Sequence, residues 1–422
     1  MGKAIGLVDC NSFFCSCEQL FEPSLRDKPV IVLSNNDGCA IARTPEAKAL
    51  GIEMAAPYFE IEELCYKNNV TTFSSNFSLY TDLSRRVLNV LETLARRVEV
   101  YSVDEAWLEL EYTSQEELEE LGKKIKEEVE RKTGIPVSVG VAPTKSLAKI
   151  ANHLAKKKRD GKSVFLMQER EQTQALSDLG CEEIWGIARA SSFKLKMMGI
   201  HTAKQFRDYS NEALIKKRLT KVGLQIKQEL QGIICFELDL ESKKKKSIRV
   251  SRTFSKTCDS LISLQESIAH YASSASTKLR RQDTLCYQLG VFIQTDRYAH
   301  VEQYSKSLWV KMATPTNDPF QLIEIAQGIT QQLYRPQYQY KKAGVMLSHF
   351  VDKSEYQLDL FNPVEIEEKK DLLKAMDRIN HLYGDGTVRS AACGVHGMAW
   401  KMRRDHKSPR YTNSWQELQK IK

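Results

Sequence analysis

The chain has 422 residues, 42% of them hydrophobic, and carries a formal net charge of +8. That hydrophobic content excludes a disordered chain, and the length corresponds to about two to four domains, each with its own core. No run of about 18 apolar residues is present, so a transmembrane helix is not expected.

The N-terminal stretch MGKAIGLVDCNSFF passes directly into a short strand and then polar residues, so it does not read as a secretory signal. The ten cysteines are scattered without CxxC pairs, which argues against a zinc site and for free thiols in a reducing compartment. The positive net charge is a weak indication of a polyanionic partner, because the position of the charge matters more. We therefore expect a cytoplasmic protein.

The first 170 residues alternate between predicted strands and helices. Ser114 with Glu117 forms a capping box at the start of one helix, Gly134 follows its end, and Thr144 caps a basic helix. A further helix is predicted over 78–95 from the spacing of its leucines and valines. The predicted strands are 4–8, 98–103, 106–110, 135–142 and 163–167. The resulting order, β-α-β-β-α-β with a further αβ pair, is the ferredoxin-like pattern, and residues 11–75 form an insertion.

Three carboxylates fall at the ends of these strands. Asp9 ends the first strand, and Asp104 and Glu105 lie where the second strand gives way to the third. One reading is an exposed edge with solvated acids; the other is a bound cation, since burying an unpaired carboxylate costs several kcal/mol. In this fold the first and third strands are neighbours, so the three acids would converge. Oxygen ligands suit Mg²⁺, and two Mg²⁺ ions about 3.5–4 Å apart are typical of phosphoryl transfer.

Long motifs then identify a family. The stretches VDCNSFF, YSVDEAWLEL and GVAPTKSLAKIANHLAKK resemble the Y-family translesion DNA polymerases, and VLSNNDGCAIARTPEAKALGI and FSSNFSLYTDLSRRV are similar to its UmuC-like branch. The resemblance covers essentially the whole chain. It implies a multidomain α+β fold with a ferredoxin-like palm, inserted fingers, a helical thumb with a helix-hairpin-helix, an α+β little finger and a C-terminal tail. The implied boundaries are palm 1–10 and 76–165, fingers 11–75, thumb 166–240, linker 241–247, little finger 248–350 and tail 351–422.

The resemblance implies error-prone, template-directed transfer of deoxynucleotides to a primer 3′-hydroxyl, acting in SOS-type damage tolerance and mutagenesis. Asp9, Asp104 and Glu105 match the family's catalytic, metal-binding carboxylates, and the Cys10 backbone carbonyl matches a further metal ligand. The implied cofactor is a pair of Mg²⁺ ions, with Mn²⁺ as a substitute. Asn11 replaces an acid found in other branches and is not expected to be a ligand.

The resemblance also implies a nucleotide site, formed by Phe13, Phe14, Arg43, Lys48 and Lys156. Phe14 matches the steric gate, the ring that excludes a 2′-hydroxyl, although many UmuC-like chains have tyrosine there. Taken alone, the two phenylalanines would be ordinary core aromatics, and Lys156 a solvated helix end. The helix that begins after Thr144 independently offers free N–H groups to a phosphate.

Residues 185–206 read as helix, turn, helix and resemble the phosphate-binding hairpin of the family's thumb, with Ala188 in place of a second glycine. A plain packed helix pair is the alternative. The lysine-rich stretch ESKKKKS, residues 241–247, is a solvated linker near a polyanion. Four alternating strands and two helices follow to about residue 350, and Arg249 and Arg252 are candidates for contact with the DNA backbone.

The tail shows no independent core and ends in the basic stretch WKMRRDHKSPRY, expected to bind DNA or a protein. Its segment QLDLF resembles the motif that binds the bacterial sliding clamp, formed here by Gln357, Leu358, Asp359, Leu360 and Phe361. By resemblance, the partners are primer-template DNA, dNTP, the clamp, a processed UmuD dimer and a RecA filament, with no membrane. The expected location is the bacterial cytoplasm, at the nucleoid.

Two other functional classes fit parts of the pattern. A nucleotide cyclase also uses a ferredoxin-like palm with metal carboxylates, but it would not need the thumb-like hairpin, the lysine linker or a second α+β unit. A DNA-binding scaffold with a decayed palm would not need all three carboxylates and Phe14. Primer extension with Mg²⁺ separates the three classes, because only a polymerase extends a primer.

Overall fold

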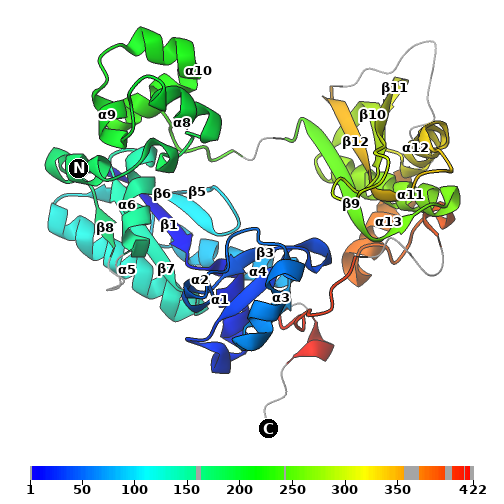
Figure 1. The fold of residues 1–422 in the computed structure, drawn as a ribbon, viewed down its shortest axis with the longest axis horizontal. Coiled ribbons are helices and arrows are strands. Elements are labelled where there is room, and N and C mark those ends of the chain that lie inside the picture. Colours follow the sequence, from blue (N-terminus) through cyan, green and yellow to red (C-terminus); the bar gives the residue numbers. More distant parts are fainter. Residues whose placement is uncertain are drawn as a thin grey trace. The chain divides into compact units, whose positions relative to one another are not determined.

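The computed structural model describes residues 2–157, 163–241, 244–355, 370–394, 402–412 and 414–418. The chain forms two compact units (Figure 1). The first unit comprises Met1–Ser242 with Asp405–Lys422, and the second unit comprises Lys243–Arg404. The predicted clamp-binding residues 357–361 lie outside the described residues. Among the described helices, none has both the length and the apolar character needed to cross a membrane.

The first unit is built on a five-stranded sheet with the order β5-β6-β1-β7-β8. Its central strand β1 pairs antiparallel with β6 on one side and with β7 on the other. The order β5-β6-β1-β7 confirms the predicted ferredoxin-like arrangement. The strands are β1 (Gly2–Cys10), β5 (Arg97–Val100), β6 (Glu105–Tyr112), β7 (Val137–Ala142) and β8 (Val164–Phe165).

Helices cover both faces of this sheet (Figure 1). On one face Val8 lies in a core with α4 (Phe77–Glu92) and α5 (Gln115–Thr133). On the other face the next residue, Leu7, packs with α6 (Lys145–Lys157), as expected because neighbouring strand residues point to opposite faces. The predicted caps of α5 are confirmed: Ser114 accepts a hydrogen bond from the Glu117 N–H, and Gly134 ends the helix at φ 71°.

Two predicted strands are shorter than expected. The second strand ends at Val100, and the chain then turns, because the N–H groups of Tyr101 and Ser102 both donate to the Glu105 carbonyl. The Ser102 hydroxyl donates to Asp104 (2.6 Å), a local side-chain bond that competes with strand pairing. The last strand, β8, has two residues rather than five.

The inserted segment forms a three-stranded sheet of order β3-β2-β4. Its elements are β2 (Val30–Leu33), β3 (Ala40–Arg43), α2 (Pro45–Ala49), α3 (Tyr58–Lys67) and β4 (Thr71–Ser74). The helix before them, α1 (Phe13–Phe21), buries Phe13 and Cys17 in the same core as α4 and α5. Residues just after Asp9 are therefore anchored against the main sheet.

Four helices complete the first unit. They share a core with α6, and the predicted helix-turn-helix corresponds to α8 and α9, with Gly199 at φ 76° between them. The helices are α7 (Glu169–Ser177), α8 (Arg189–Lys196), α9 (Ala203–Asp208) and α10 (Glu212–Leu230).

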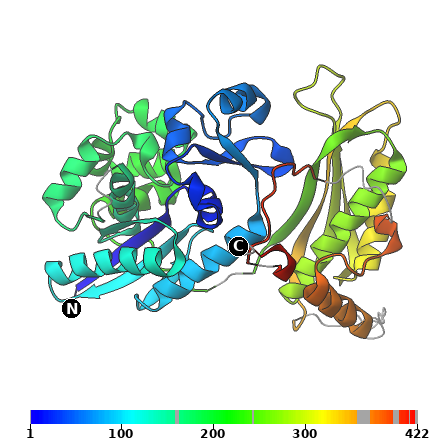
Figure 2. The ribbon, with the colours of Figure 1, turned by 90° about the horizontal axis from the view of Figure 1, so that it is seen from below.

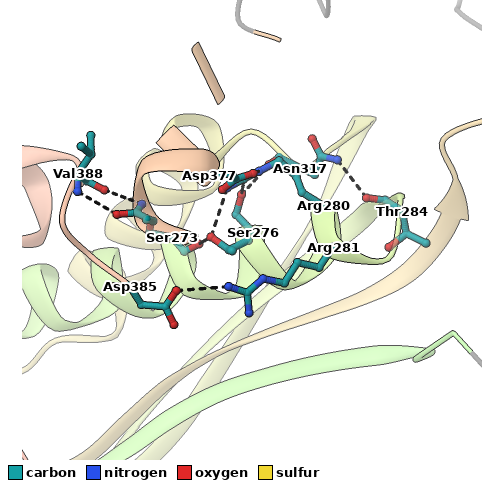
Figure 3. Close-up of polar contacts among 11 residues, drawn as sticks. Ser273, Ser276, Arg280, Arg281, Thr284, Asn317, Asp377, Asp385 and Val388 are labelled. Carbon is teal, nitrogen blue, oxygen red and sulfur yellow. Dashed lines mark hydrogen bonds and ion pairs between the residues drawn. The ribbon is translucent and has the colours of Figure 1, made fainter. Parts of the chain in front are cut away.

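The second unit is an antiparallel sheet of order β11-β10-β12-β9, with α11 and α12 on one face (Figure 2). The predicted alternation of four strands and two helices is confirmed. The elements are β9 (Ser247–Cys258), α11 (Leu261–Arg281), β10 (Thr284–Gln294), β11 (Ser305–Thr316), α12 (Pro319–Leu333) and β12 (Tyr340–Asp352). A further helix, α13 (Lys370–Tyr383), docks on α11 through a two-pronged ion pair between Arg280 and Asp377, at 2.6 and 2.7 Å (Figure 3).

The C-terminal residues return to the first unit. Residues 405–412, here called the C-terminal strap, pair with the end of β4 through a parallel bridge between Ser74 and Lys407. In Figure 2 the strap is the red segment beside the blue inserted elements. Part of the basic stretch 400–411 is thus packed against the chain itself.

Candidate active site

Three carboxylates lie at one end of the main sheet. Asp9 is the direct cross-strand partner of Glu105, and Asp104 precedes Glu105 in the turn before β6. The Cys10 N–H donates to the Asp104 carbonyl at 2.9 Å, which fixes that turn against β1. The structure therefore brings together the three acids and Cys10.

Asp9 and Glu105 influence each other's ionisation. Burial and a hydrogen bond with Glu105 raise the pKa of Asp9 to about 7, against the opposing effect of Lys156. Burial alone would raise the pKa of Glu105, but hydrogen bonds from Asp9 and Lys149 outweigh it and the pKa is lowered. Of the two carboxyl groups, Asp9 is therefore the one that binds a proton more readily.

Two lysines of α6 neutralise the remaining charge. Lys156 Nζ lies 2.5 Å from Asp9 Oδ2, and Lys149 donates to Glu105. Lys149 Nζ also lies 4.9 Å from the centre of the Tyr101 ring, a cation–π contact. Lys149 is not among the residues predicted from the sequence, although its seven-residue spacing from Lys156 places both on one helix face.

One cavity of about 290 Å³ collects the predicted palm and fingers residues. Its lining includes all nine of them: Asp9, Cys10, Phe13, Phe14, Arg43, Lys48, Asp104, Glu105 and Lys156. A larger hollow, of about 530 Å³, shares only Ser12 with this lining and is otherwise lined by residues such as Asn11, Glu46 and Glu130. Asn11 accepts a hydrogen bond from Ser138 (2.8 Å) and does not line the smaller cavity.

The cavity carries cationic groups opposite the acids. Burial and the neighbouring charges of Arg43 and Lys156 lower the pKa of Lys48. Arg43 donates through Nη1 to the Ile52 carbonyl (2.7 Å), while its Nε is buried with no hydrogen-bond partner in the described part of the chain. An anion entering here would gain a donor that the protein leaves unsatisfied.

Aromatic rings form another wall. Phe14 is half-buried and stacks on Tyr80, with ring centres 4.6 Å apart and an angle of 16°, while Phe77 meets Phe14 edge-on at 5.9 Å. Phe13 is only 3% exposed, so it belongs to the core as well as to the cavity lining. Before them Ser12 adopts φ 46°, an uncommon conformation that turns the chain from β1 into α1.

The donor set fits divalent cations. It offers the carboxylate oxygens of Asp9, Asp104 and Glu105 at one cavity, and oxygen ligands are those that hard cations prefer. Within the described ranges, no group of three or more His, Cys, Asp and Glu side chains is arranged to hold a metal ion. The ammonium groups of Lys149 and Lys156 already pair with these oxygens, so cation binding requires the lysines to give way.

The other predicted contact residues lie in the second unit or outside the described ranges. Arg249 and Arg252 are exposed on the edge strand β9, and Arg249 lies 4.3 Å from the centre of the Phe292 ring. Gln357, Leu358, Asp359, Leu360 and Phe361 are not described.

Comparisons with known proteins identify the family of the chain. Family models match residues 8–153 (impB/mucB/samB family), 245–360 (impB/mucB/samB family C-terminal domain) and 370–421 (a domain of unknown function). The chain is 38% identical to Protein UmuC of Salmonella typhimurium, over 99% of both chains, and 37% identical to Protein SamB of Salmonella typhimurium, over 98% of both.

A solved Y-family DNA polymerase chimera, Dbh-Dpo4(243-245)-Dbh, has the same fold, with a TM-score of 0.65 and 22% identity, over 83% of this chain and 99% of that one. The two curated relatives align with 98–99% of the chain. The chain therefore belongs to the impB/mucB/samB family of UmuC-like, Y-family translesion DNA polymerases.

Proposed function

We propose that this polymerase adds deoxynucleotides to a primer 3′-hydroxyl in the 290 Å³ cavity, using two Mg²⁺ ions, with Mn²⁺ as a substitute. The observation that carries the proposal is that nine residues from distant parts of the sequence line this one cavity. Acids, bases and aromatic rings each occupy part of its wall, as expected for a site that must bind metal ions, a triphosphate and a sugar.

Asp9, Asp104 and Glu105, with the Cys10 carbonyl, would hold the cations. The bound cations would activate the attacking hydroxyl and stabilise the charge on the leaving pyrophosphate. Asp9 has to bind a cation in its deprotonated form, as metal ligands do, although burial raises its pKa to about 7. Lys156 is 41% exposed on its side chain, so it is free to turn from Asp9 toward a phosphate.

Arg43, Lys48 and Lys156 would bind the triphosphate. The buried, unpaired Nε of Arg43 and the lowered pKa of Lys48 both reflect positive groups confined together, a state that an anion relieves. Phe13 and Phe14 would contact the nucleotide, and the Phe14 ring would act as the steric gate that excludes a 2′-hydroxyl. The stacking of Phe14 on Tyr80 supports this role, because the ring can exclude a 2′-hydroxyl only if it stays in place.

Primer-template DNA and dNTP are the proposed substrates, with Arg249 and Arg252 on the DNA backbone and α8–α9 on a phosphate. The exposure of both arginines on an edge strand supports sequence-independent contacts. By resemblance we also propose the sliding clamp, bound through residues 357–361, a processed UmuD dimer and a RecA filament as partners. Such partners would place the protein at the bacterial nucleoid.

The first prediction tests the carboxylates. Asp104→Asn should lower nucleotide incorporation by on the order of 100-fold or more, because a metal ligand is lost, while DNA affinity stays within about twofold. Primer extension with Mg²⁺ and a DNA-binding titration measure the two effects. Asp82→Asn, on the outer side of α4 and paired with Arg86, is the matched control and should behave like wild type. Normal incorporation by the Asp104 variant would contradict the proposal.

A further inference from the structure

The C-terminal strap, residues 405–412, is fastened to the first unit through its backbone. The Ser74 N–H donates to the His406 carbonyl (2.9 Å), and the His406 N–H donates to the Ser74 hydroxyl (3.0 Å). The Asp405 N–H donates to the Asp37 carboxylate at 2.8 Å. The strap thus adds an extended segment beside β4, at the edge of the inserted sheet.

Two strap side chains are buried in the first unit. Tyr411 is 5% exposed and stacks on Phe21, with ring centres 4.4 Å apart and an angle of 8°. Ser408 is also 5% exposed and accepts a hydrogen bond from the Asn76 side chain at 3.0 Å. The same Asn76 amide group donates to the Pro409 carbonyl at 3.1 Å, so the strap is held on both sides of Ser408.

The Ser408 hydroxyl then donates to a buried acid. Its acceptor is Glu18 Oε1 at 3.1 Å, and the same oxygen accepts from the Tyr80 hydroxyl at 2.6 Å. Glu18 is 1% exposed, and its Oε2 has no hydrogen-bond partner among the described residues. The place of this carboxyl group is therefore fixed through Oε1, by one donor from α4 and one from the strap.

Tyr80 carries the connection to the cavity. Its ring is fully buried and is the surface on which Phe14 stacks, nearly parallel at 4.6 Å. A shift of the Tyr80 hydroxyl would tilt the ring beneath Phe14, and interiors are too closely packed for the tilt to be absorbed elsewhere. Ser408, Glu18, Tyr80 and Phe14 thus form one continuous chain of contacts from the C-terminal region to the cavity, although they lie up to 394 positions apart in the sequence.

We propose that the C-terminal strap, through Ser408, Glu18 and Tyr80, sets the position of Phe14 and so contributes to the selection of deoxyribose over ribose. Ser408, Glu18 and Tyr80 are positioning residues, and the inference rests on the proposed role of Phe14. The strap lies within residues 370–421, which match a domain of unknown function, so this proposal assigns a role to part of that domain.

The test compares ATP with dATP incorporation by the full-length protein on one template. Ser408→Ala removes the strap's donor and should lower the selectivity for dATP by about twofold to tenfold, the scale of one hydrogen bond. The change should arise from more efficient use of ATP, with kcat for dATP nearly unaltered. Glu18→Gln keeps an Oε1 acceptor for both hydroxyls and should retain the selectivity, whereas Glu18→Leu should lose it.

Arg410→Ala is the matched control, because Arg410 is an exposed strap residue that pairs with Glu417 and should leave selectivity unchanged. Phe14→Ala tests the gate role of Phe14 separately from the influence of the strap. If this variant fails to admit ATP, the gate assignment itself is wrong. If Phe14→Ala admits ATP but Ser408→Ala and Glu18→Leu leave the ratio unaltered, the strap inference is overturned. An equal fall of ATP and dATP use in Ser408→Ala would also overturn it, since that result indicates support of the fold only.

Discussion

Asp9 and Glu105 face each other directly across β1 and β6, an unfavourable place for two ionised carboxylates. The ammonium groups of Lys156 and Lys149 relieve part of the repulsion, and burial raises the pKa of Asp9 to about 7. These interactions are reversible, because Asp9 can be deprotonated and the long lysine side chains can turn away from the carboxylates. The site can therefore exchange its lysine contacts for contacts with cations.

Phe14 provides a test at the scale of one side chain. Phe14→Ala should raise ATP incorporation relative to dATP by about tenfold or more, equivalent to ~1.4 kcal/mol, because the ring no longer occupies the space of the 2′-hydroxyl. Single-nucleotide extension with each substrate on the same template measures the ratio. Leu20→Ala, on the same helix and away from the cavity lining, is the control. An unchanged ratio would make Phe14 a packing residue.

Glu18 predicts a pH effect on stability. Burial raises its pKa from 4.5 to about 7, so the folded protein binds a proton that the unfolded chain has lost. Its stabilising contribution is complete below pH 4.5 and is lost as the pH rises to about 7, a change of about 3 kcal/mol. Glu18→Gln cannot titrate. Urea unfolding at pH 5 and pH 8 should show wild type losing more stability than the variant; an equal loss would contradict the assignment.

At the scale of the element, α6 places both active-site lysines by lying unusually close to β7. A Cβ atom on Gly140 would lie 2.1 Å from the backbone nitrogen of Asn152, so only glycine allows this approach. The Asn152 side chain then donates to the carbonyls of Ser138 (2.8 Å) and Leu7 (3.2 Å), which fastens the helix to two strands.

Gly140→Ala should therefore destabilise the first unit by about 2–4 kcal/mol, because backbone atoms cannot move aside as a side chain would. It should also reduce incorporation, since Lys149 and Lys156 move with the helix. Calorimetric unfolding and primer extension measure the two effects. Gly328→Ala in α12, where a Cβ meets no atom within 4 Å, is the control and should be neutral or slightly stabilising. Equal unfolding temperatures for the two variants would refute the packing argument.

Elements with local signals could be predicted from the sequence, and those defined by distant partners could not. Ser114 and Gly134 mark the ends of α5 through bonds to residues within four positions. The convergence of the three acids could be predicted because the expected strand order makes β1 and β6 neighbours, whereas their metal-binding role came from the family resemblance. Lys149 was missed because a lysine on a basic helix has no distinctive pattern until Glu105 is placed beside it. Tyr80 was missed for the same reason, since an aromatic residue at helical spacing resembles any core residue.

At the scale of the whole molecule, the second unit is an insertion between parts of the first. The C-terminal region is anchored on both: α13 binds α11 through Arg280 and Asp377, and the strap binds β4 and Glu18 (Figures 2 and 3). The sequence analysis read this region as a tail ending in a basic patch. The docking of the strap could not be predicted from the sequence, because it depends on backbone hydrogen bonds and two isolated side chains, Ser408 and Tyr411. Such contacts leave no periodic hydrophobic pattern.

The last prediction concerns the segment QLDLF, which joins the second unit's sheet to α13 in the sequence and lies outside the described residues. Two leucines and a phenylalanine in a polar stretch are typical of a motif that fills a partner's pocket. Burying Leu360 and Phe361 would supply about 1.5–3 kcal/mol each, enough for a weak tether that raises the local concentration at a primer end.

Leu360→Ala with Phe361→Ala should therefore weaken clamp binding by on the order of 100-fold or more and abolish clamp-stimulated synthesis. Extension of a short primer without the clamp should stay near wild type, because the cavity of the first unit is untouched. The matched control is Leu382→Ala with Tyr383→Ala, an exposed apolar pair at the end of α13, which should bind the clamp normally. A titration in which both double variants bind the clamp like wild type would show that the segment has another partner, since its apolar side chains would then contribute nothing to this interface.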